Sequence, residues 1–177
     1  MKFLSTKLPG AYVVELERRE DERGFFARAW CEEEFAAQGL NMRVVQCNIS
    51  FNHKRGTLRG LHYQAAPHAE KKLVRCVRGG IYDVIIDLRP SSPTFKHWFA
   101  TELTVENFRM LYVPEGFAHG LQTLEDNTEI SYLMSESFHP ESAGGVRWND
   151  PSFGIEWPPC AQRIISERDA SYEDFTC

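Results

Sequence analysis

The segment Arg59-Gly60-Leu61-His62-Tyr63-Gln64 concentrates more chemistry than any other short stretch of the chain. A histidine exchanges protons near neutral pH, and an arginine binds phosphate well. The segment therefore predicts a proton-transfer residue, His62, close to an anion-binding residue, Arg59. On a regular strand these two side chains would lie on opposite faces, because side chains alternate. A strand that only half-buries a structural histidine would show the same pattern, so that alternative stays open here.

A second such segment is Pro114-Glu115-Gly116-Phe117-Ala118-His119. Its proline and glycine predict a tight turn that delivers His119 to the start of a strand. This P-x-G-x-x-H pattern resembles the second motif of the cupin superfamily, whose fold is a jelly roll. Metal-binding cupins add an H-x-H pair, which this chain lacks: the histidine after His62 is His68, in a proline-containing loop. A first-row metal needs about three protein ligands, so the sequence predicts no metal site.

Composition limits the class of protein. The 177 residues are 42% hydrophobic and 12% aromatic, which predicts one folded domain over residues 1–177. The formal net charge of -5 argues against a broad nucleic-acid-binding surface, although it allows a local basic pocket. No apolar run is long enough to span a membrane, and the first ten residues are too polar for a signal peptide. The five cysteines form no C-x-x-C pair, which predicts reduced thiols in a cytoplasmic protein.

The order of apolar and turn-forming residues predicts many short strands, which is typical of a sandwich or barrel. One short helix is expected over residues 31–39, with glutamates in its first turn and Gly39 at its end. Residues 18–24 predict a turn, residues 78–80 a hairpin loop, and the chain from Ser152 an irregular tail. The predicted strands are residues 11–17, 25–30, 43–51, 57–63, 72–77, 81–88, 98–103, 110–113, 119–124 and 128–134.

Charged residues inside predicted strands are informative because a strand interior rarely carries charge without a reason. Lys72 opens one strand, and Asp83 and Asp87 share a face of another. If both strands face the same interior, Lys72 and an aspartate could pair there. Such a pair is compatible with a functional site and equally with a structural ion pair.

The chain resembles the dTDP-4-dehydrorhamnose 3,5-epimerase family over nearly its whole length. The resemblance implies an all-β, cupin-type jelly roll with a few short helices. It is carried by an ordered series of motifs, residues 21–26, 46–50, 59–64, 72–74, 83–84 with 87–89, 92–95, 114–120, 148–151 and 166–169.

The resemblance also implies roles for individual residues. The general base falls on His62, its paired aspartate on Asp169, the proton donor on Tyr132, and the lysine near the sugar's keto oxygen on Lys72. A nucleotide-diphosphate sugar is the implied substrate, in a cofactor-free homodimer whose N-terminal strands exchange between subunits. The implied substrate contacts are Arg23, Gln46, Asn48, Arg59, His119 and Arg168.

These residue types suit inversion of a carbon next to a ketone. A base must remove the hydrogen, a cation must stabilise the enolate oxygen, and an acid must return a proton from the other face. The expected reaction inverts C3 and C5 of a 4-keto-6-deoxy sugar, from dTDP-4-dehydro-6-deoxyglucose to dTDP-4-dehydrorhamnose.

Three positions depart from the family pattern: Arg28 replaces an acidic residue, Phe138 a tyrosine and Ala143 a glutamate. They lie among residues that recognise substrate rather than among the acid and base. Two alternatives therefore stay open, a single-centre epimerase of the same fold and a non-catalytic cupin that binds sugar nucleotides.

Overall fold

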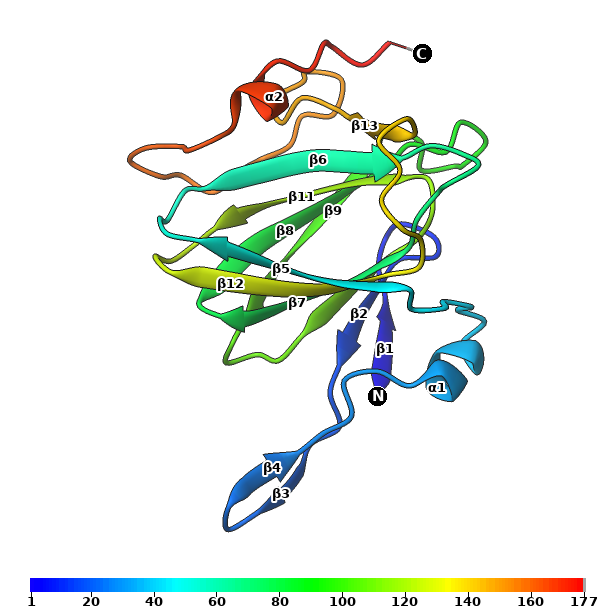
Figure 1. The fold of residues 1–177 in the computed structure, drawn as a ribbon, viewed down its shortest axis with the longest axis vertical. Helices are drawn as coiled ribbons and strands as arrows, with labels where there is room; N and C mark the ends of the chain where they lie inside the picture. The colour runs from blue at the N-terminus through cyan, green and yellow to red at the C-terminus, as the bar shows by residue number, and fades with distance from the viewer. Residues whose placement is uncertain (177) are drawn as a thin grey trace.

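The computed structural model describes residues 1–176, and two facing antiparallel sheets make up its body (Figure 1). The larger sheet has the strand order β1-β2-β10-β7-β12-β5. Its strands are β1 (Lys2–Ser5), β2 (Tyr12–Glu15), β10 (Met110–Val113), β7 (Lys72–Arg78), β12 (Thr128–Met134) and β5 (Gln46–Asn52).

The smaller sheet has the order β13-β6-β11-β8-β9. Its strands are β13 (Ala143–Gly145), β6 (Leu58–Gln64), β11 (Phe117–Thr123), β8 (Gly80–Asp87) and β9 (Trp98–Thr104). Buried side chains from both sheets, such as Val74, Ile85 and Ile130, form one apolar cluster between them. The expected all-β, cupin-type jelly roll is therefore confirmed.

The segment predicted as a turn and strand at residues 18–30 is instead a small hairpin arm. Strands β3 (Arg19–Asp21) and β4 (Gly24–Phe26) pair only with each other, and all six of their residues are exposed. The arm projects away from the two sheets (Figure 1). Arg23 lies in its turn, where the guanidinium donates a hydrogen bond of 2.6 Å to Asp21 Oδ2.

Two short helices complete the described chain. Helix α1 (Glu32–Ala36) lies inside the predicted range, and its buried Phe35 packs beside Phe3 and Tyr112. Helix α2 (Glu167–Ala170) was not predicted. The hydroxyl of Ser166 accepts a hydrogen bond from the Asp169 amide and thereby caps this helix.

The predicted hairpin at residues 78–80 is wrong. β7 and β8, which flank it, lie in different sheets, so the bend at Gly79 carries the chain from one sheet to the other. The prediction failed because a glycine-containing bend can either close a hairpin or carry the chain to another sheet. Only the pairing of each strand with distant strands distinguishes these two cases. Gly79 adopts φ of 74° there.

Apart from α2, the tail from Ser152 is irregular as predicted, and it covers the outer face of the smaller sheet. Phe153, Ile155, Trp157 and Phe175 pack against a second apolar cluster that includes Val84. Strand β8 is consequently buried on both faces. Cys31, Cys47, Cys76 and Cys160 are free thiols. Among residues 1–176 no helix is long and apolar enough to cross a membrane.

Candidate active site

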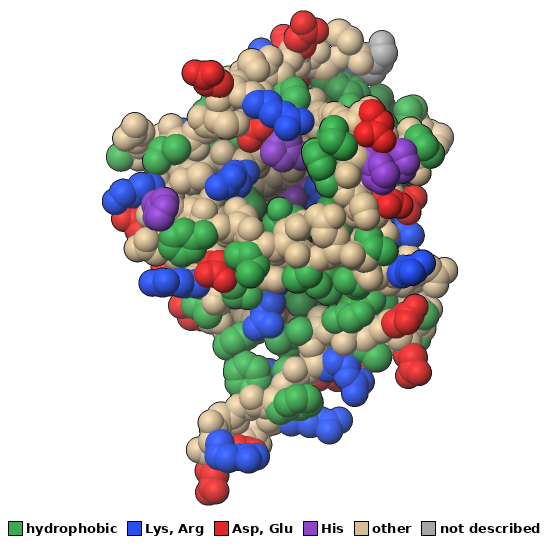
Figure 2. Space-filling view, in the orientation of Figure 1, with side chains coloured by type: hydrophobic (Ala, Val, Ile, Leu, Met, Phe, Trp, Pro, Cys, Tyr) green, Lys and Arg blue, Asp and Glu red, His purple; other side chains and the backbone are tan. Residues whose placement is uncertain are grey.

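Two adjoining cavities open between the sheets, and Figure 2 shows the hollow on this face of the molecule. His62, Lys72 and Tyr132 border both cavities. The first, of about 360 Å³, is also lined by Arg59 and His119. The second, of about 440 Å³, is also lined by Gln46, Asn48 and Arg168.

The strand pairing explains why these side chains meet. Lys72 pairs with Met134 across β7 and β12, so it shares a face of the larger sheet with Tyr132, two residues earlier. His62 and His119 are partners across β6 and β11 in the opposite sheet. The cation and the phenol therefore approach the space from one sheet, and the imidazoles approach it from the other.

His62 and Asp169 form a hydrogen-bonded dyad. His62 Nε2 lies 2.7 Å from Asp169 Oδ1, and the Gly60 amide donates to Asp169 Oδ2 at 3.0 Å. Burial alone would raise the pKa of Asp169, but the hydrogen bonds from His62 and Gly60 outweigh it and lower that pKa. Since an ionised carboxylate only accepts hydrogen bonds, Nε2 must carry a proton, and the free lone pair of the neutral imidazole then lies on Nδ1. The dyad thus fixes the orientation of the imidazole and selects Nδ1 as its basic nitrogen.

The expected pairing of Lys72 with a strand aspartate is wrong. Lys72 Nζ instead lies 2.9 Å from Glu70 Oε1, and both side chains are only 9% exposed. Asp83, fully buried, holds His119 through a 2.8 Å contact between Oδ1 and Nε2. The aspartate was the wrong partner because Asp83 lies in the other sheet, beside the strand that carries His119.

Tyr132 is buried enough to affect its acidity. Burial raises the pKa of its phenol above the ordinary value of 10.0, against a smaller lowering effect of Arg59. The phenol is therefore protonated at neutral pH, as a proton donor requires.

Arg59 and His62 border the same cavity, although regular alternation would place them on opposite faces. The pairing of β6 with β11 is irregular: His119 pairs with His62 and Leu121 with Arg59, so three steps on β6 match two on β11. This bulge adds one residue and brings both side chains to the same face. Gly60 lies inside it with φ of 106°, and a Cβ there would come within 2.7 Å of Gly120 Cα.

The structure thus brings nine of the ten predicted site residues together. Eight line the two cavities and Asp169 lies behind His62. The exception is Arg23, whose side chain is 84% exposed on the β3–β4 arm.

Sequence reasoning missed two residues at this site. Glu70 is the ion-pair partner of Lys72. Gln64 has an almost fully buried side-chain amide and lines the second cavity. Glu70 precedes a predicted strand and had no periodic signal. Gln64 ended the first motif, but its burial depends on the fold and could not be predicted from the sequence.

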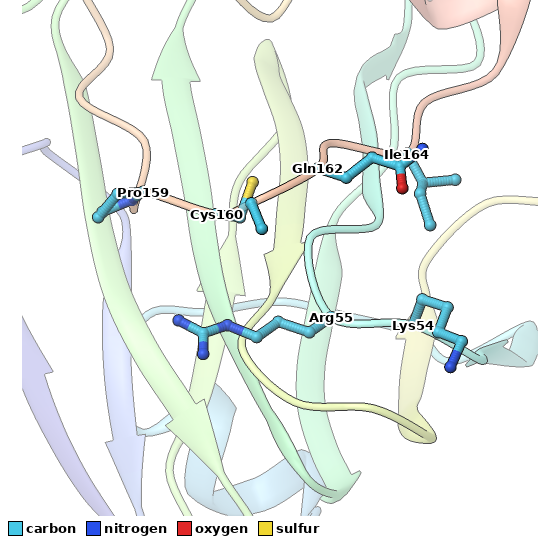
Figure 3. Close-up of a pocket in the computed structure, with 7 residues that line it drawn as sticks. Lys54, Arg55, Pro159, Cys160, Gln162 and Ile164 are labelled. Carbon is cyan, nitrogen blue, oxygen red and sulfur yellow. The ribbon is translucent and has the colours of Figure 1, made fainter.

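A larger cavity, of about 520 Å³, lies between the β5–β6 loop and the C-terminal segment (Figure 3). Lys54, Arg55, Cys160 and Gln162 are among the residues that line it. None of the predicted acid, base or substrate-binding residues reaches it, so its size does not make it the candidate active site.

Comparisons with known proteins agree with this geometry. Residues 5–176 match the sequence profile described as dTDP-4-dehydrorhamnose 3,5-epimerase. The chain belongs to this epimerase family. A relative of that name from Methanothermobacter thermautotrophicus is 43% identical over 97% of this chain and 93% of its own.

Solved structures of epimerases are also similar. The dTDP-4-dehydrorhamnose 3,5-epimerase of Elizabethkingia anophelis has a TM-score of 0.96 and 42% identity, over 99% of this chain and 96% of that chain. A 3'-monoepimerase from Streptomyces bikiniensis, in complex with dTDP-quinovose, has a TM-score of 0.88 and 32% identity over 96% of this chain and 85% of that chain. Both double- and single-centre enzymes therefore share this fold.

In this family member the three departures lie in different places. Phe138 and Ala143 line the second cavity, where their side chains supply no hydroxyl or carboxylate. Arg28 lies outside both cavities and donates a 2.7 Å hydrogen bond to Glu34 Oε1.

Proposed function

We propose that the protein is an epimerase that inverts C3 and C5 of dTDP-4-dehydro-6-deoxyglucose to give dTDP-4-dehydrorhamnose. The observation that carries this proposal is that His62 on one sheet, held by Asp169 of α2, borders the same two cavities as the Tyr132 phenol on the other sheet. A base and an acid on opposite sides of one space are what inversion requires. Family membership supports the same reaction.

In the proposed first step, Nδ1 of His62 removes the hydrogen from a carbon next to the C4 ketone. The electrons of the broken C–H bond form a carbon–carbon double bond, and the keto oxygen becomes an enolate. Lys72 stabilises that negative oxygen, and electrostatic stabilisation of this kind is commonly the largest catalytic contribution. Asp169 stabilises the imidazolium that His62 becomes.

In the second step, Tyr132 donates its proton to the opposite face of the carbon, and the enolate returns to the ketone. Solvent then reprotonates the tyrosinate and accepts the proton from His62. The cycle repeats at the other carbon beside C4. Since only protons move, the proposal includes no cofactor and no metal.

Substrate binding is proposed to rest on the cationic and amide side chains of the cavities. Arg59 and His119 would hold the diphosphate, and Arg168, Gln46 and Asn48 lie beside the second cavity. Arginine presents a planar set of donors that suits phosphate oxygens. This local basic character is compatible with the overall charge of -5.

We further propose a homodimer in which N-terminal strands exchange. Arg23 is remote from the cavities of its own subunit, so a substrate contact would have to come from the partner subunit's Arg23. Exposed apolar side chains on and next to β5 support this assembly: Ile49 is 71% exposed, and Val45, the residue before the strand, is 44% exposed.

The proposed catalytic domain is residues 1–177, of which Cys177 lies outside the described residues. A cytoplasmic location, supported by the free thiols, stays part of the proposal, without nucleic-acid or membrane partners.

The second candidate is an epimerase that inverts one centre. It is supported by the similarity to a 3'-monoepimerase and by the position of Phe138 in the second cavity. A non-catalytic sugar-nucleotide-binding protein is the third alternative, but simple binding has no use for a facing base and acid.

The deciding experiment is incubation of the protein with dTDP-4-dehydro-6-deoxyglucose and related 4-keto-6-deoxy sugar nucleotides in deuterated water, followed by NMR. Deuterium at both C3 and C5 of an inverted product is the expected result. Deuterium at one carbon supports the single-centre enzyme, and binding without exchange supports the third alternative. The His62→Ala variant should show no exchange.

A further inference from the structure

A pair of histidines outside the candidate active site is packed in an unusual way. The imidazoles of His68 and His139 stack with centroids 3.6 Å apart and planes 4° from parallel. His68 lies in the loop after β6, and His139 lies in the loop after β12. Figure 2 shows histidine and acidic side chains gathered beside the hollow.

Three ligand atoms converge at this pair. Glu141 Oε1 lies 3.2 Å from His139 Nδ1 and 3.9 Å from His68 Nδ1. The ligand atoms of these three residues lie within 4.8 Å of one another. Glu136 Oε1 stands 3.7 Å from the other ring nitrogen of His139, where a carboxylate can orient a ligating imidazole.

One buried amide, that of Gln64, makes three of the hydrogen bonds that hold the two loops in place. The Gln64 side chain donates from Nε2 to the carbonyl oxygens of His68 and Ser137, at 3.0 and 3.1 Å. Its Oε1 accepts a hydrogen bond of 2.6 Å from the His139 amide. The Ala65 amide also donates to the Ser142 carbonyl at 2.8 Å, which ties the loops together a second time. The backbone at both histidines is therefore fixed before any ligand arrives.

We propose that His68, His139 and Glu141 bind one divalent ion of the zinc type. Two imidazoles and a carboxylate match the ligands that Zn²⁺ takes at about 2.0–2.2 Å, with water free to fill a fourth position. Ligand atoms on a tetrahedron of that size lie about 3.3 Å apart. The contact of Glu141 with His139 already has that length, at 3.2 Å, and its contact with His68 would shorten from 3.9 Å on binding. Mg²⁺ and Ca²⁺ prefer all-oxygen sites, so they should not compete.

Binding must change the ring geometry. A metal ion lies in the plane of each imidazole that ligates it, and two parallel rings 3.6 Å apart cannot both satisfy this. The rings must tilt apart while their backbones stay anchored by Gln64. Since Phe138 lines the second cavity and precedes His139, the ion would link two loops at the edge of that cavity.

No H-x-H pair in the sequence marks this site. Its histidines come from two loops that only the fold brings together, and it lies apart from the catalytic residues. The proposal does not depend on the proposed function, because binding can be measured without substrate.

The test is titration of the untagged, chelator-treated full-length protein with ZnCl₂, followed by calorimetry and by competition with a chromophoric zinc indicator. One site per chain is expected, with at least tenfold weaker binding in His68→Asn, His139→Asn and Glu141→Gln. His97→Asn is the control, because His97 is an exposed histidine away from these loops. MgCl₂ should give no saturable signal.

NMR of the histidine ring protons gives the second readout. On addition of Zn²⁺, the signals of two rings should shift together as the stack opens, and those of His97 should not. Glu141→Gln keeps the test valid if a histidine variant fails to fold, because the Glu141 side chain is 64% exposed. Undiminished zinc binding in these variants, or no saturable binding by the native chain, would overturn the proposal.

Discussion

The carboxylate of Asp169 joins the C-terminal helix to the strand that carries His62. One of its oxygens lies 2.7 Å from His62 Nε2, and the other accepts the Gly60 amide at 3.0 Å. The aspartate therefore has no freedom to rotate away from the imidazole. This relationship fixes both the tautomer and the direction of the basic nitrogen, although the two residues are far apart in sequence.

The first prediction concerns this dyad. Asp169→Asn removes the negative charge that keeps the proton on Nε2 and stabilises the imidazolium. We expect turnover to fall about a hundredfold or more, the usual contribution of a positioned acid or base. The measurement is the initial rate of deuterium incorporation from deuterated water. Ser166→Ala, which removes only the side-chain cap of α2, is the control, and its rate should fall far less. Equal rates for the native and Asp169→Asn enzymes would exclude the aspartate from catalysis.

Tyr132→Phe should separate proton removal from proton return. The variant keeps His62 and Lys72, so exchange of the sugar hydrogens continues. It lacks the acid on the opposite side, so formation of inverted product should fall at least a hundredfold. NMR of one reaction reports exchange and stereochemistry together. Normal product stereochemistry at the normal rate would show that Tyr132 is not the donor.

Lys72 offers a third prediction, with its neighbour as the matched control. Lys72→Met removes the cation beside the enolate and should lower the exchange rate about a hundredfold or more. Lys71→Met should have little effect, because Lys71 Nζ donates instead to the Asn41 carbonyl and lies 3.1 Å from Glu115.

The stability of the same variants tests the ion pair behind Lys72. Lys72→Met leaves the Glu70 carboxylate buried without its partner, which should cost about 3 kcal/mol of unfolding free energy. The double variant Lys72→Met with Glu70→Gln should recover most of that stability and none of the activity. Recovery of exchange in the double variant would mean that Lys72 acts only as a structural partner of Glu70.

Local patterns predicted best those strands that have a partner strand on each side. Residues 110–113 and 128–134 coincide with β10, which pairs with β2 and β7, and with β12, which pairs with β5 and β7. The motif residues were also found, since their order in the chain carries the family pattern. What failed depended on distant partners that no local pattern encodes.

Two failures show this most clearly. Arg59 and His62 were placed on opposite faces because the bulge opposite His119 depends on the pairing of β6 with β11. Lys72 was given a strand aspartate because the local sequence does not show that Asp83 enters the other sheet, where it contacts His119, whereas Glu70 lies just before β7 and reaches Lys72. In both cases the residue types correctly indicated a functional site. The face on which Arg59 lies and the ion-pair partner of Lys72 were decided by the order of strands in the sheets.

The last prediction uses the buried carboxylate of Asp87, which lies outside the cavities. Burial alone would raise the pKa of Asp87, but hydrogen bonds from Arg89, Ser92 and Thr94 outweigh it and lower the pKa from 3.8 to about 2. A depressed folded-state pKa stabilises the fold above the unfolded-state pKa, and that stability is lost as the pH falls through the folded-state value. The shift corresponds to about 2 kcal/mol near neutral pH.

Asp87→Asn should therefore lower the unfolding free energy by about 2 kcal/mol at pH 7, measured by urea denaturation. The difference from the native chain should shrink as the pH falls from about 4 to about 2, because the native carboxylate becomes protonated over that range. Asp126→Asn, at an exposed aspartate, is the control and should show a much smaller effect. A difference between Asp87→Asn and the native chain that stays constant down to pH 2 would mean that packing, rather than the ionised carboxylate, is what Asp87 contributes.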